Sequence, residues 1–338
     1  VFPHTSTGTV RASTSTPNAA RRHPRPRAMT ASPGQPAPRI VIAGGSGFIG
    51  GHLARRFRAR GVDVVILTRT AKARTDGVRE VAWDGRTVGA WARELDGAAA
   101  LVNLTGKSVN CRHTPANKHE IILSRVDSVR VIAGAIAAST VPVPVWVQAS
   151  AVGIYGNAGD RLCDESAPHG ADFMAQVCEK WEGALAEATM PRTRRVALRF
   201  GVALGRDGGA LPMLARLARW GLGGTVASGT QYMSWIHIDD LASVVERAIE
   251  RVTMVGAYNA ATHTAATNAA FMRRLRRVVH RPWSPPAPAF AVEIGSWIIG
   301  TDAEVALHGQ RCVPRRLDED GFAFAHEDLG ETMAGLLG

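Results

Sequence analysis

Cysteine is scarce in this sequence of 338 residues, and its four cysteines form no recognisable site. Cys111, Cys163, Cys178 and Cys312 are far apart and include no CxxC pair, which excludes a small disulfide scaffold. Cys111 stands two residues before His113, but two ligand types without a partner cluster fall short of a metal site, so we predict no metal. We expect reduced thiols in a reducing compartment.

The sequence also has no clear membrane-spanning run. The longest stretch without a charged residue, 131–159, contains Pro142, Pro144 and Gln148, which argue against a span. We interpret this stretch as a helix end, a turn and a buried strand. The chain is 46% hydrophobic and 20% charged, and this composition excludes a chain that is disordered throughout.

Acidic residues are absent from residues 1–38, which carry five arginines. The segment is rich in Ser, Thr and Pro and has no apolar period, so we expect a disordered basic leader. It fits the upstream extension of a bacterial, cytoplasmic chain that begins at Met29, and this alternative is preferred. It also fits a transit peptide for the chloroplast stroma or the mitochondrial matrix.

The positive charge gives only weak evidence of a partner. The net charge is +11, and without the five arginines of the leader it is +6, which is mildly basic for about 300 residues. The basic stretch 273–277 (RRLRR) is typical of a solvated helix face. We therefore predict no nucleic-acid partner.

From residue 39 onward, short apolar runs alternate with amphipathic stretches, which is typical of βαβ units and a parallel sheet. The predicted strands are 39–43, 63–67, 79–83, 100–104, 144–149 and 195–199. The predicted helices are 48–60, 115–139, 171–188 and 210–219. We predict an α/β fold with a doubly wound, Rossmann-type parallel sheet. We assign the later elements, 239–251, 256–260 and 267–280, to a second, smaller substrate lobe.

A glycine-rich turn follows the first predicted strand. Gly44, Gly47 and Gly50 have a GxxGxxG spacing and lead into a helix with apolar periodicity. The first glycine allows a sharp turn, the second lets backbone N–H groups approach a pyrophosphate, and the third allows the helix to pack closely on its strand. We assign this turn, with Phe48 and Ile49 at the start of the helix, to dinucleotide binding. The alternative is a tight turn of an α/β fold without a ligand.

No acidic residue ends the second predicted strand, where an NAD enzyme places Asp or Glu against the ribose hydroxyls. The sequence at this point reads Leu67, Thr68, Arg69, Thr70. An arginine can pair with a 2′-phosphate, so Arg69 favours NADP as the cofactor, with NAD as the alternative. Arg69 could also be a solvated loop residue.

Segments spread over nearly all of the chain after residue 38 carry a resemblance to a known family. They are GGSGFIG (44–50), LTR (67–69), VNLTG (102–106), ILSR (122–125), SAVGIYG (150–156), CEKWE (178–182), LRFGVALG (198–205), GLGG (221–224), WIHIDD (235–240), YNAA (258–261) and GQRCVPRRLDEDGFAF (309–324). Together they resemble the extended, atypical short-chain dehydrogenase/reductases, in the NAD(P)-dependent epimerase/dehydratase-like subgroup known as epimerase family proteins. The resemblance implies an NAD(P)-binding Rossmann domain over 39–284 and a C-terminal segment of unassigned function over 285–338.

The resemblance also implies further residues of the nucleotide site. By it, the nucleotide is lined by Thr68, Arg69, Leu104, Thr105, Glu120 and Arg125. Leu104 and Thr105 end a predicted strand, and ligands of such folds sit at the carboxyl ends of the strands. Glu120 and Arg125 are five residues apart on one predicted helix, so they lie only partly on one face, and either could be structural.

Classical members of the superfamily transfer a proton with the tyrosine of a YxxxK motif, whose lysine lowers the pKa of that tyrosine. This motif is absent here, and the resemblance implies that the subgroup as a whole lacks it. When the helix that carries CEKWE is used as the anchor, the usual Tyr and Lys positions correspond to Met174 and Cys178. Methionine has no proton to transfer, and Cys178 has no base beside it in the sequence. The standard machinery for hydride transfer is therefore incomplete.

Ser150 and Tyr155 remain as the candidate catalytic residues. Ser150 ends the strand PVWVQAS, where the superfamily commonly places a Ser or Thr that binds a substrate oxygen; otherwise it is a strand-end cap. Tyr155 is a proton donor if it faces the cleft, and a packing aromatic if it does not.

Two other polar residues have weaker claims. Lys107 could polarise a carbonyl or bind a phosphate, but a solvated loop lysine is an equal alternative. His237 could act as an acid or base. In the resembling families, however, its segment mainly begins a helix, for which Asp239 or Asp240 is the expected N-cap.

These features predict an NADP(H)-binding oxidoreductase or epimerase-like protein that exchanges hydride with a small carbonyl or hydroxyl substrate. The alternative is a non-catalytic dinucleotide-binding protein that contacts or regulates a protein partner, which the missing YxxxK motif favours. The substrate is not named by the sequence, because specificity in such folds resides in the loops of the variable lobe.

Overall fold

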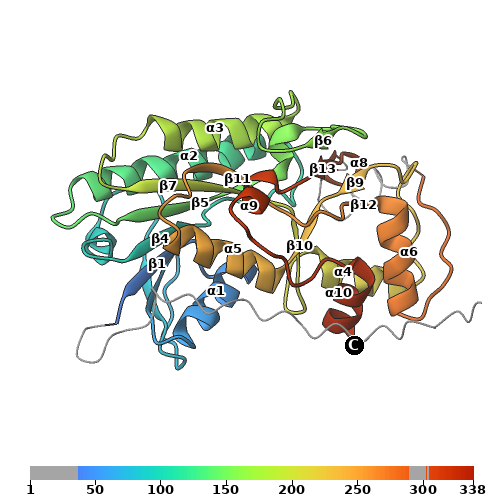
Figure 1. Ribbon diagram of the computed structural model, residues 1–338, viewed down its shortest axis with the longest axis horizontal. Coiled ribbons are helices and arrows are strands. Elements are labelled where there is room, and N and C mark those ends of the chain that lie inside the picture. Colours follow the sequence, from blue (N-terminus) through green and yellow to red (C-terminus); the bar gives the residue numbers. More distant parts are fainter. Residues whose placement is uncertain (1–36, 289–301, 303) are drawn as a thin grey trace, which may run out of the picture.

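The computed structural model describes residues 37–288, 302 and 304–338, and the predicted leader therefore lies outside the described residues, except for residues 37 and 38. Its central feature is a seven-stranded sheet in which all neighbouring strands are parallel (Figure 1). In sheet order, the strands are β11 (Gly256–Ala260), β7 (Arg194–Phe200), β5 (Val145–Ala151), β4 (Ala100–Asn103), β1 (Arg39–Ala43), β2 (Asp63–Thr68) and β3 (Arg79–Ala82). The six predicted strands are confirmed, and the order reverses direction at β1, as in a doubly wound fold.

Helices cover both faces of this sheet. One face carries α1 (Phe48–Arg58) and α5 (Ile238–Glu250), and the other carries α2 (Pro115–Ala137) and α3 (Phe173–Glu187) (Figure 1). Since side chains alternate along a strand, each strand supplies apolar residues to both faces. No helix of the described residues is long and apolar enough to cross a membrane.

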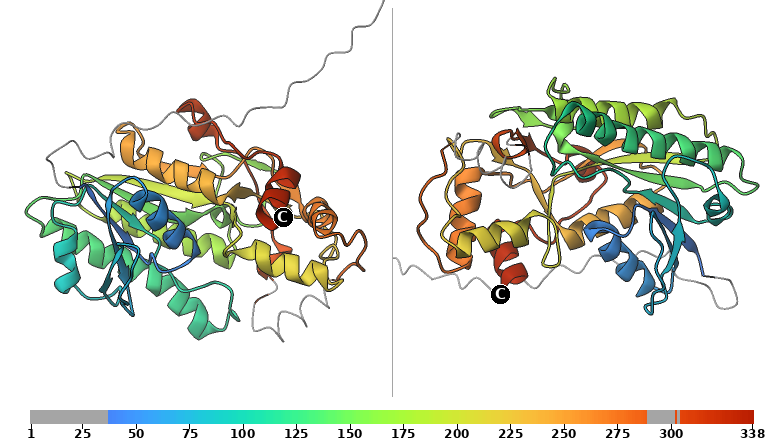
Figure 2. Two further views of the ribbon diagram at one scale, coloured as in Figure 1. Left: turned by 90° about the horizontal axis from the view of Figure 1, so that it is seen from below. Right: turned by 180° about the vertical axis from the view of Figure 1, so that it is seen from behind.

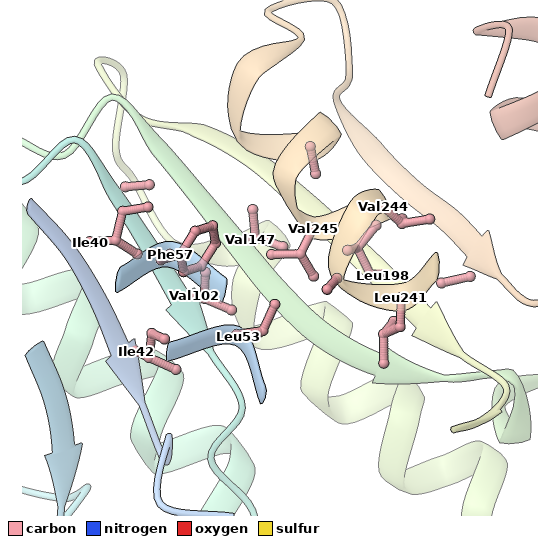
Figure 3. Packing of buried hydrophobic residues seen from close by; sticks show 14 of the residues in the cluster. Ile40, Ile42, Leu53, Phe57, Val102, Val147, Leu198, Leu241, Val244 and Val245 are labelled. Atoms are coloured by element: carbon pink, nitrogen blue, oxygen red, sulfur yellow. The ribbon is translucent and has the colours of Figure 1, made fainter. Parts of the chain in front are cut away.

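The core under α1 and α5 shows this alternation directly (Figure 3). Ile40 and Ile42 of β1 point toward Leu53 and Phe57 of α1, and all four side chains are fully buried. Val41, which lies between the two isoleucines in sequence, instead joins the cluster under α2 and α3. The apolar run of β1 is therefore continuous because both of its faces are covered.

The prediction that 239–251 and 256–260 belong to a second lobe is wrong. β11 extends the main sheet, with Asn259 opposite Arg199 of β7. On α5, Leu241 and Val244 pack into the same core as α1. The cause is physical: beyond α1 the sheet face over β5 and β7 needs a second cover, and the apolar face of α5 supplies it.

The second lobe is smaller than predicted and lies at one end of the sheet (Figure 2). Its core is formed by α4 (Ala210–Arg219), α6 (Asn268–Val278) and α10 (Leu329–Leu337). Short strand pairs lead into this lobe: β8 (Val202–Leu204) with β10 (Trp235–His237), and β9 (Tyr232–Met233) with β12 (Ala266–Thr267).

The C-terminal segment contacts both parts of the molecule. α8 (Glu304–Leu307) is followed by β13 (Arg311–Cys312), which pairs with β6 (Leu162–Cys163). α9 (Arg315–Glu319) then packs on β11, and α10 ends in the second lobe against α6. Among the described residues, the remaining elements are two 3-10 helices, η1 (Ala90–Glu94) and η2 (Val152–Tyr155).

Candidate functional site

The glycine turn lies where the carboxyl ends of β1, β2 and β4 meet. The backbone N–H of Gly44 donates to the carbonyl of Leu67 at 2.9 Å, and Gly44 has φ +69°. A Cβ at Gly44 would lie 2.9 Å from the backbone of Thr105, so only glycine fits between β1 and the loop after β4. At Gly47, by contrast, a Cβ would meet no atom within 4 Å. The turn is therefore tightly packed at Gly44 and leaves free space at Gly47.

The start of α1 offers backbone donors without side-chain competition. Gly47 is the N-cap and makes no side-chain cap hydrogen bond. The Phe48 ring packs against the 205–209 turn, where a Cβ at Gly205 would lie 2.4 Å from the ring, and Ile49 packs on the core. Phe48 and Ile49 thus present their backbone N–H groups, which have no partner within a helix, at the open side of the turn.

The end of β2 combines a buried threonine with an exposed arginine. The hydroxyl of Thr68 donates to Ser46 Oγ at 3.3 Å, which ties β2 to the glycine turn. Arg69 is exposed, and its guanidinium has no hydrogen bond or ion pair within the described part of the chain. The edge beside the glycine turn is therefore positively charged, and no acid stands at the carboxyl end of β2, since Asp63 lies at its opposite end and pairs with Arg39.

The loop after β4 carries a buried hydroxyl that lacks a partner. The N–H of Leu104 donates to the carbonyl of Ala43 at 2.9 Å, and this bond holds the loop against β1. Thr105 Oγ1 is buried and has no hydrogen-bond partner among the described residues, 37–288, 302 and 304–338. A buried hydroxyl without a partner is costly, and its position against Gly44 fits a ligand that would accept or donate the missing bond.

Arg125 of α2 lies against the same loop. Its Nη1 donates to the carbonyls of Lys107 at 3.0 Å and Ile121 at 2.9 Å. Its guanidinium lies 4.9 Å from the centre of the Trp181 ring, and a Cβ at Gly106 would lie 2.8 Å from it. Burial lowers the pKa of Arg125 to about 10, so the group stays cationic at neutral pH.

Glu120 takes a different partner from Arg125. Its carboxylate accepts from Arg86 Nη2 at 2.8 Å and 3.0 Å in an exposed ion pair. The two α2 residues implied by the resemblance therefore form separate contacts, as their five-residue spacing predicts.

A buried polar network connects β5, η2, α3 and β7. Ser150 Oγ donates to Glu182 Oε1 at 2.6 Å, and Arg199 binds both oxygens of Glu182 at 2.9 Å. Arg199 Nη1 also donates to the hydroxyl of Tyr155 at 2.9 Å, and that hydroxyl donates to Asn259 Oδ1 at 2.7 Å. Ser150 thus lies at the end of β5 with a carboxylate beside it.

Tyr155 is almost fully buried, at 1% exposure, and both of its hydrogen-bonding directions are occupied. Burial raises the pKa of its hydroxyl well above the ordinary value, although the charge of Arg199 acts in the opposite direction. The phenol therefore stays protonated, and it lies in the packing cluster of η2, β6 and β13.

Of the two positions expected for the YxxxK pair, Cys178 adjoins Ser150 and Glu182 of this network, and Met174 packs beside Phe173 and Val177. Met174 packs against Gly153 of η2, where an added Cβ would lie 3.5 Å from the Met174 Cβ. Cys178 is buried, and burial together with the charge of Glu182 raises the pKa of its thiol to about 12. The Met174 side chain has no proton to transfer, and the Cys178 thiol stays protonated at neutral pH.

His237 is the N-cap of α5, so the prediction of Asp239 or Asp240 is wrong. Its Nδ1 accepts from the N–H of Asp239 at 3.1 Å. The ring stacks on His326 at 3.8 Å, and burial followed by the charge of His326 lowers the pKa of His237 to about 4. The lone pair of a neutral imidazole at the end of β10 thus accepts a backbone N–H of the first turn, which is what a capping side chain does. The His237 side chain also lines a cavity of about 430 Å³ between α1, α5 and the C-terminal segment.

Lys107, the other candidate from the loop after β4, has a partner within the protein. Lys107 Nζ donates to Asn117 Oδ1 at 2.8 Å, so it is a paired loop lysine.

Sequence reasoning missed Arg199 and Asn259 as members of the network, although an arginine inside the apolar strand RRVALRF is a visible signal of a buried ionic contact.

Comparison of the sequence with known proteins shows which family it matches. Residues 40–261 match the NAD dependent epimerase/dehydratase family, and residues 287–336 match a domain of unknown function, DUF1731. The chain is 33% identical over 304 residues to the epimerase family protein SDR39U1 homolog, chloroplastic, of Arabidopsis thaliana, covering 88% of this chain and 86% of that protein. It is 34% identical over 303 residues to epimerase family protein SDR39U1 of Bos taurus, covering 87% and 98%.

A solved structure agrees with these matches. The crystal structure of human epimerase family protein SDR39U1 (isoform 2) with NADPH is similar to this chain, with a TM-score of 0.78 and 31% identity. The similarity covers 88% of this chain and 98% of the human chain.

Proposed function

The chain belongs to the NAD dependent epimerase/dehydratase family, and from that premise we propose that it binds NADP(H) and exchanges hydride with a small carbonyl or hydroxyl substrate. Within that family, the similarity over most of the chain is to proteins named epimerase family proteins, and this chain also matches DUF1731 at its C-terminal end. The observation that carries the choice of NADP is Arg69, which is exposed and unpaired among the described residues where an NAD enzyme has an acid.

The cofactor site consists of the glycine turn and the loop after β4. Gly44, Gly47 and the first backbone N–H groups of α1 would hold the pyrophosphate, and the Thr105 hydroxyl would gain its missing hydrogen bond. Arg69 would pair with the 2′-phosphate. The NADPH named for the human relative supports this choice. When bound, the cofactor supplies or accepts hydride at C4 of the nicotinamide.

By this proposal, Ser150 binds the substrate oxygen from the end of β5. Glu182 accepts a hydrogen bond from its hydroxyl at 2.6 Å, which fixes the Ser150 rotamer before a substrate enters. Tyr155 is two hydrogen-bonded residues away, through Arg199 and Glu182. To act as a proton donor, Tyr155 would first have to break the hydrogen bond in which its hydroxyl donates to Asn259. If that hydrogen bond stays intact, Tyr155 only positions Arg199.

The cofactor proposal is tested by calorimetric titration of the purified full chain with NADPH and with NADH. We expect NADPH to bind more tightly, and Arg69→Ala to weaken NADPH about tenfold or more while NADH binding changes little. Arg274→Ala, at an exposed arginine of α6, is the matched control and should change neither affinity. Equal affinity of the native chain for both cofactors, or the same loss in both variants, contradicts the role of Arg69.

The reaction is tested by following NADPH oxidation with a panel of sugars, aldehydes and quinones. We expect turnover with at least one class and a loss of about a hundredfold in kcat for Ser150→Ala, with NADPH affinity retained. Tyr155→Phe removes only the phenol oxygen and separates a proton donor from a packing aromatic. Unchanged kcat in Ser150→Ala refutes its catalytic role.

Met174 and Cys178 support a second candidate function. With no proton-transferring group at either position, a dinucleotide-binding protein that contacts or regulates a protein partner remains the alternative. Tight retention of NADPH without turnover of any panel member favours this alternative over catalysis.

We propose the cytoplasm as the location, with the chloroplast stroma or mitochondrial matrix as the alternative. The four thiols are free, which suits a reducing compartment. The name of the Arabidopsis relative, in turn, supports the organellar alternative. Fractionation of source cells, followed by detection of the full chain with an antibody, distinguishes these compartments.

A further inference from the structure

His113 lies between two carboxylates that come from a distant part of the chain. It stands in the loop before α2, and its side chain is only 1% exposed. Its Nδ1 lies 3.7 Å from Asp302 Oδ2 and 3.8 Å from Glu304 Oε2. The candidate ligand atoms of the three residues all lie within 4.8 Å of one another.

The hydrogen bonds of His113 show which ring nitrogen is free. Nε2 lies 3.1 Å from the carbonyl of Val109, which can only accept, so Nε2 carries the proton. In the neutral ring, Nδ1 then has a lone pair. This atom is buried and has no hydrogen-bond partner in residues 37–288, 302 and 304–338. A lone pair that faces two carboxylate oxygens, all three being acceptors, calls for a cation between them.

The distances from His113 Nδ1 to the two carboxylates fit a shared metal ion better than hydrogen bonds. An imidazolium bound to a carboxylate would bring nitrogen and oxygen to about 2.8 Å, whereas both distances here approach 4 Å. Two ligands of one tetrahedral ion, each about 2.0–2.2 Å from the metal, lie about 3.3–3.5 Å apart. His113 Nδ1 therefore needs to approach each oxygen by only a few tenths of an ångström to share a metal with it, while a hydrogen bond needs a shift of nearly one. The two carboxylate oxygens, which lie within 4.8 Å of each other, would close on the same ion.

We propose that His113, Asp302 and Glu304 bind one divalent transition-metal ion of the zinc class. An imidazole with two carboxylates suits Zn²⁺, Mn²⁺ or Co²⁺ better than Ca²⁺ or Mg²⁺, which prefer sites made only of oxygen. Three protein ligands leave a fourth position for water.

The surroundings of the three ligands resemble the outer shell of a metal site. The Val109 carbonyl fixes the His113 tautomer and the ring orientation, as such acceptors do for metal-bound histidines. The other oxygen of Glu304 lies 3.6 Å from His308 Nδ1, which in turn lies 3.4 Å from Asp172 Oδ2. Asp172 is the N-cap of α3, so the cluster joins the C-terminal segment to the loop before α2 and to the start of α3.

The ion would fasten the C-terminal segment to the Rossmann domain. Among the described residues, the hydrogen bond that links Asp302 to His113 is a long one, from the His113 N–H to Asp302 Oδ2 at 3.4 Å. A metal would replace this weak contact with coordinate bonds between elements that are 189 residues apart in sequence.

The test uses the full chain, stripped with a chelator and then titrated with Zn²⁺ against a chromophoric competitor. We expect one Zn²⁺ per chain, and a visible absorption band when Co²⁺ is used instead. Asp302→Asn, at a side chain that is 32% exposed, should keep the fold and weaken Zn²⁺ binding about tenfold or more. His113→Gln should do the same, and His119→Gln, at an exposed histidine of α2, should not.

The outcomes decide between a metal site and an ion pair. If Zn²⁺ binds the native chain, His119→Gln and Asp302→Asn equally, or binds none of them, the proposal is wrong and the cluster is only a contact between His113 and two carboxylates. Thermal unfolding with and without Zn²⁺ gives a second measurement, since a bound metal must raise the Tm of the native chain more than that of Asp302→Asn at the same Zn²⁺ concentration. NADPH affinity measured on the same samples reports separately on the proposed function.

Discussion

Arg199 of β7 binds Glu182 of α3 with two parallel hydrogen bonds, from Nε to Oε1 and from Nη2 to Oε2, both at 2.9 Å. The two side chains are only 5% and 16% exposed. A planar fork of donors on a planar carboxylate fixes the distance and the angle between helix and strand. Since Glu182 Oε1 also accepts from Ser150, the pair determines where the Ser150 hydroxyl points.

Removal of the carboxylate charge should leave Arg199 buried without a counterion. We expect Glu182→Gln to lower the free energy of unfolding by about 3 kcal/mol in urea denaturation, because a buried cation without its partner is strongly destabilising. The control is Glu319→Gln at the exposed pair of Arg315 and Glu319, where both side chains are 61% exposed and no measurable change is expected. Equal small effects in both variants contradict a tightly coupled buried pair.

Gly44 and Gly61 test whether the glycine turn is specific for the cofactor. Both have a left-handed φ, +69° and +78°, so the backbone strain of Ala alone should cost about 1 kcal/mol of stability at either position. At Gly44 the new Cβ also lies 2.9 Å from the Thr105 backbone, whereas at Gly61 it meets nothing within 4 Å. We expect Gly44→Ala to abolish NADPH binding in calorimetry and Gly61→Ala to retain it. Retained binding in Gly44→Ala contradicts the cofactor site at this turn.

The sheet could be predicted from the sequence because its signals are local. The apolar run of β1, the glycines after it and the helix that follows are adjacent in the chain, so no knowledge of packing is needed to interpret them. The edge strand β11 and the helix α5 were assigned to the wrong lobe. Their place depends on which sheet face remains uncovered, which is a property of the assembled fold.

The site, too, has parts that follow from local sequence and parts that depend on the assembled fold. The glycine turn and Arg69 follow their strands directly, so their positions could be predicted. His113 had no visible partner because Asp302 lies 189 residues away, on a segment whose path no local pattern predicts. The cap of α5 was assigned to Asp239 or Asp240 because a neutral histidine is a less common N-cap than a carboxylate.

Thr105→Val should change stability and cofactor affinity in opposite directions. Val keeps the shape of Thr and removes a buried hydroxyl that has no partner in the described residues, so the chain without cofactor should gain up to about 1 kcal/mol of stability. If the hydroxyl binds NADPH, the same change should weaken NADPH about tenfold. Urea denaturation and calorimetry measure the two effects.

Thr193→Val is the matched control for Thr105→Val. The Thr193 hydroxyl is buried but donates to the carbonyl of Val143 at 2.8 Å, so its loss should destabilise the chain by about 1 kcal/mol and leave NADPH affinity unchanged. A loss of stability in both variants would show that Thr105 has a partner in the absence of cofactor.

Glu250 of α5 should make the stability depend on pH. Burial, and then the charge of Glu246, raise the pKa of Glu250 from 4.5 to about 7, and its Oε1 is buried without a hydrogen-bond partner among the described residues. The folded chain thus holds a proton that the unfolded chain releases. The stabilising contribution of this proton is complete below about pH 4.5 and is lost as the pH rises through 7.

Glu250→Gln, which stays neutral at every pH, should remove this loss. At pH 5 we expect the variant and the native chain to unfold at nearly the same urea concentration. At pH 8.5 the variant should be more stable, by at most about 1 kcal/mol because solvent screens a partly exposed group. Glu187→Gln, at an exposed glutamate of α3, should show no such difference between the two pH values. A variant that is no more stable than the native chain at pH 8.5 would mean that Glu250 ionises there at no cost, through a contact that the burial of its oxygen does not reveal.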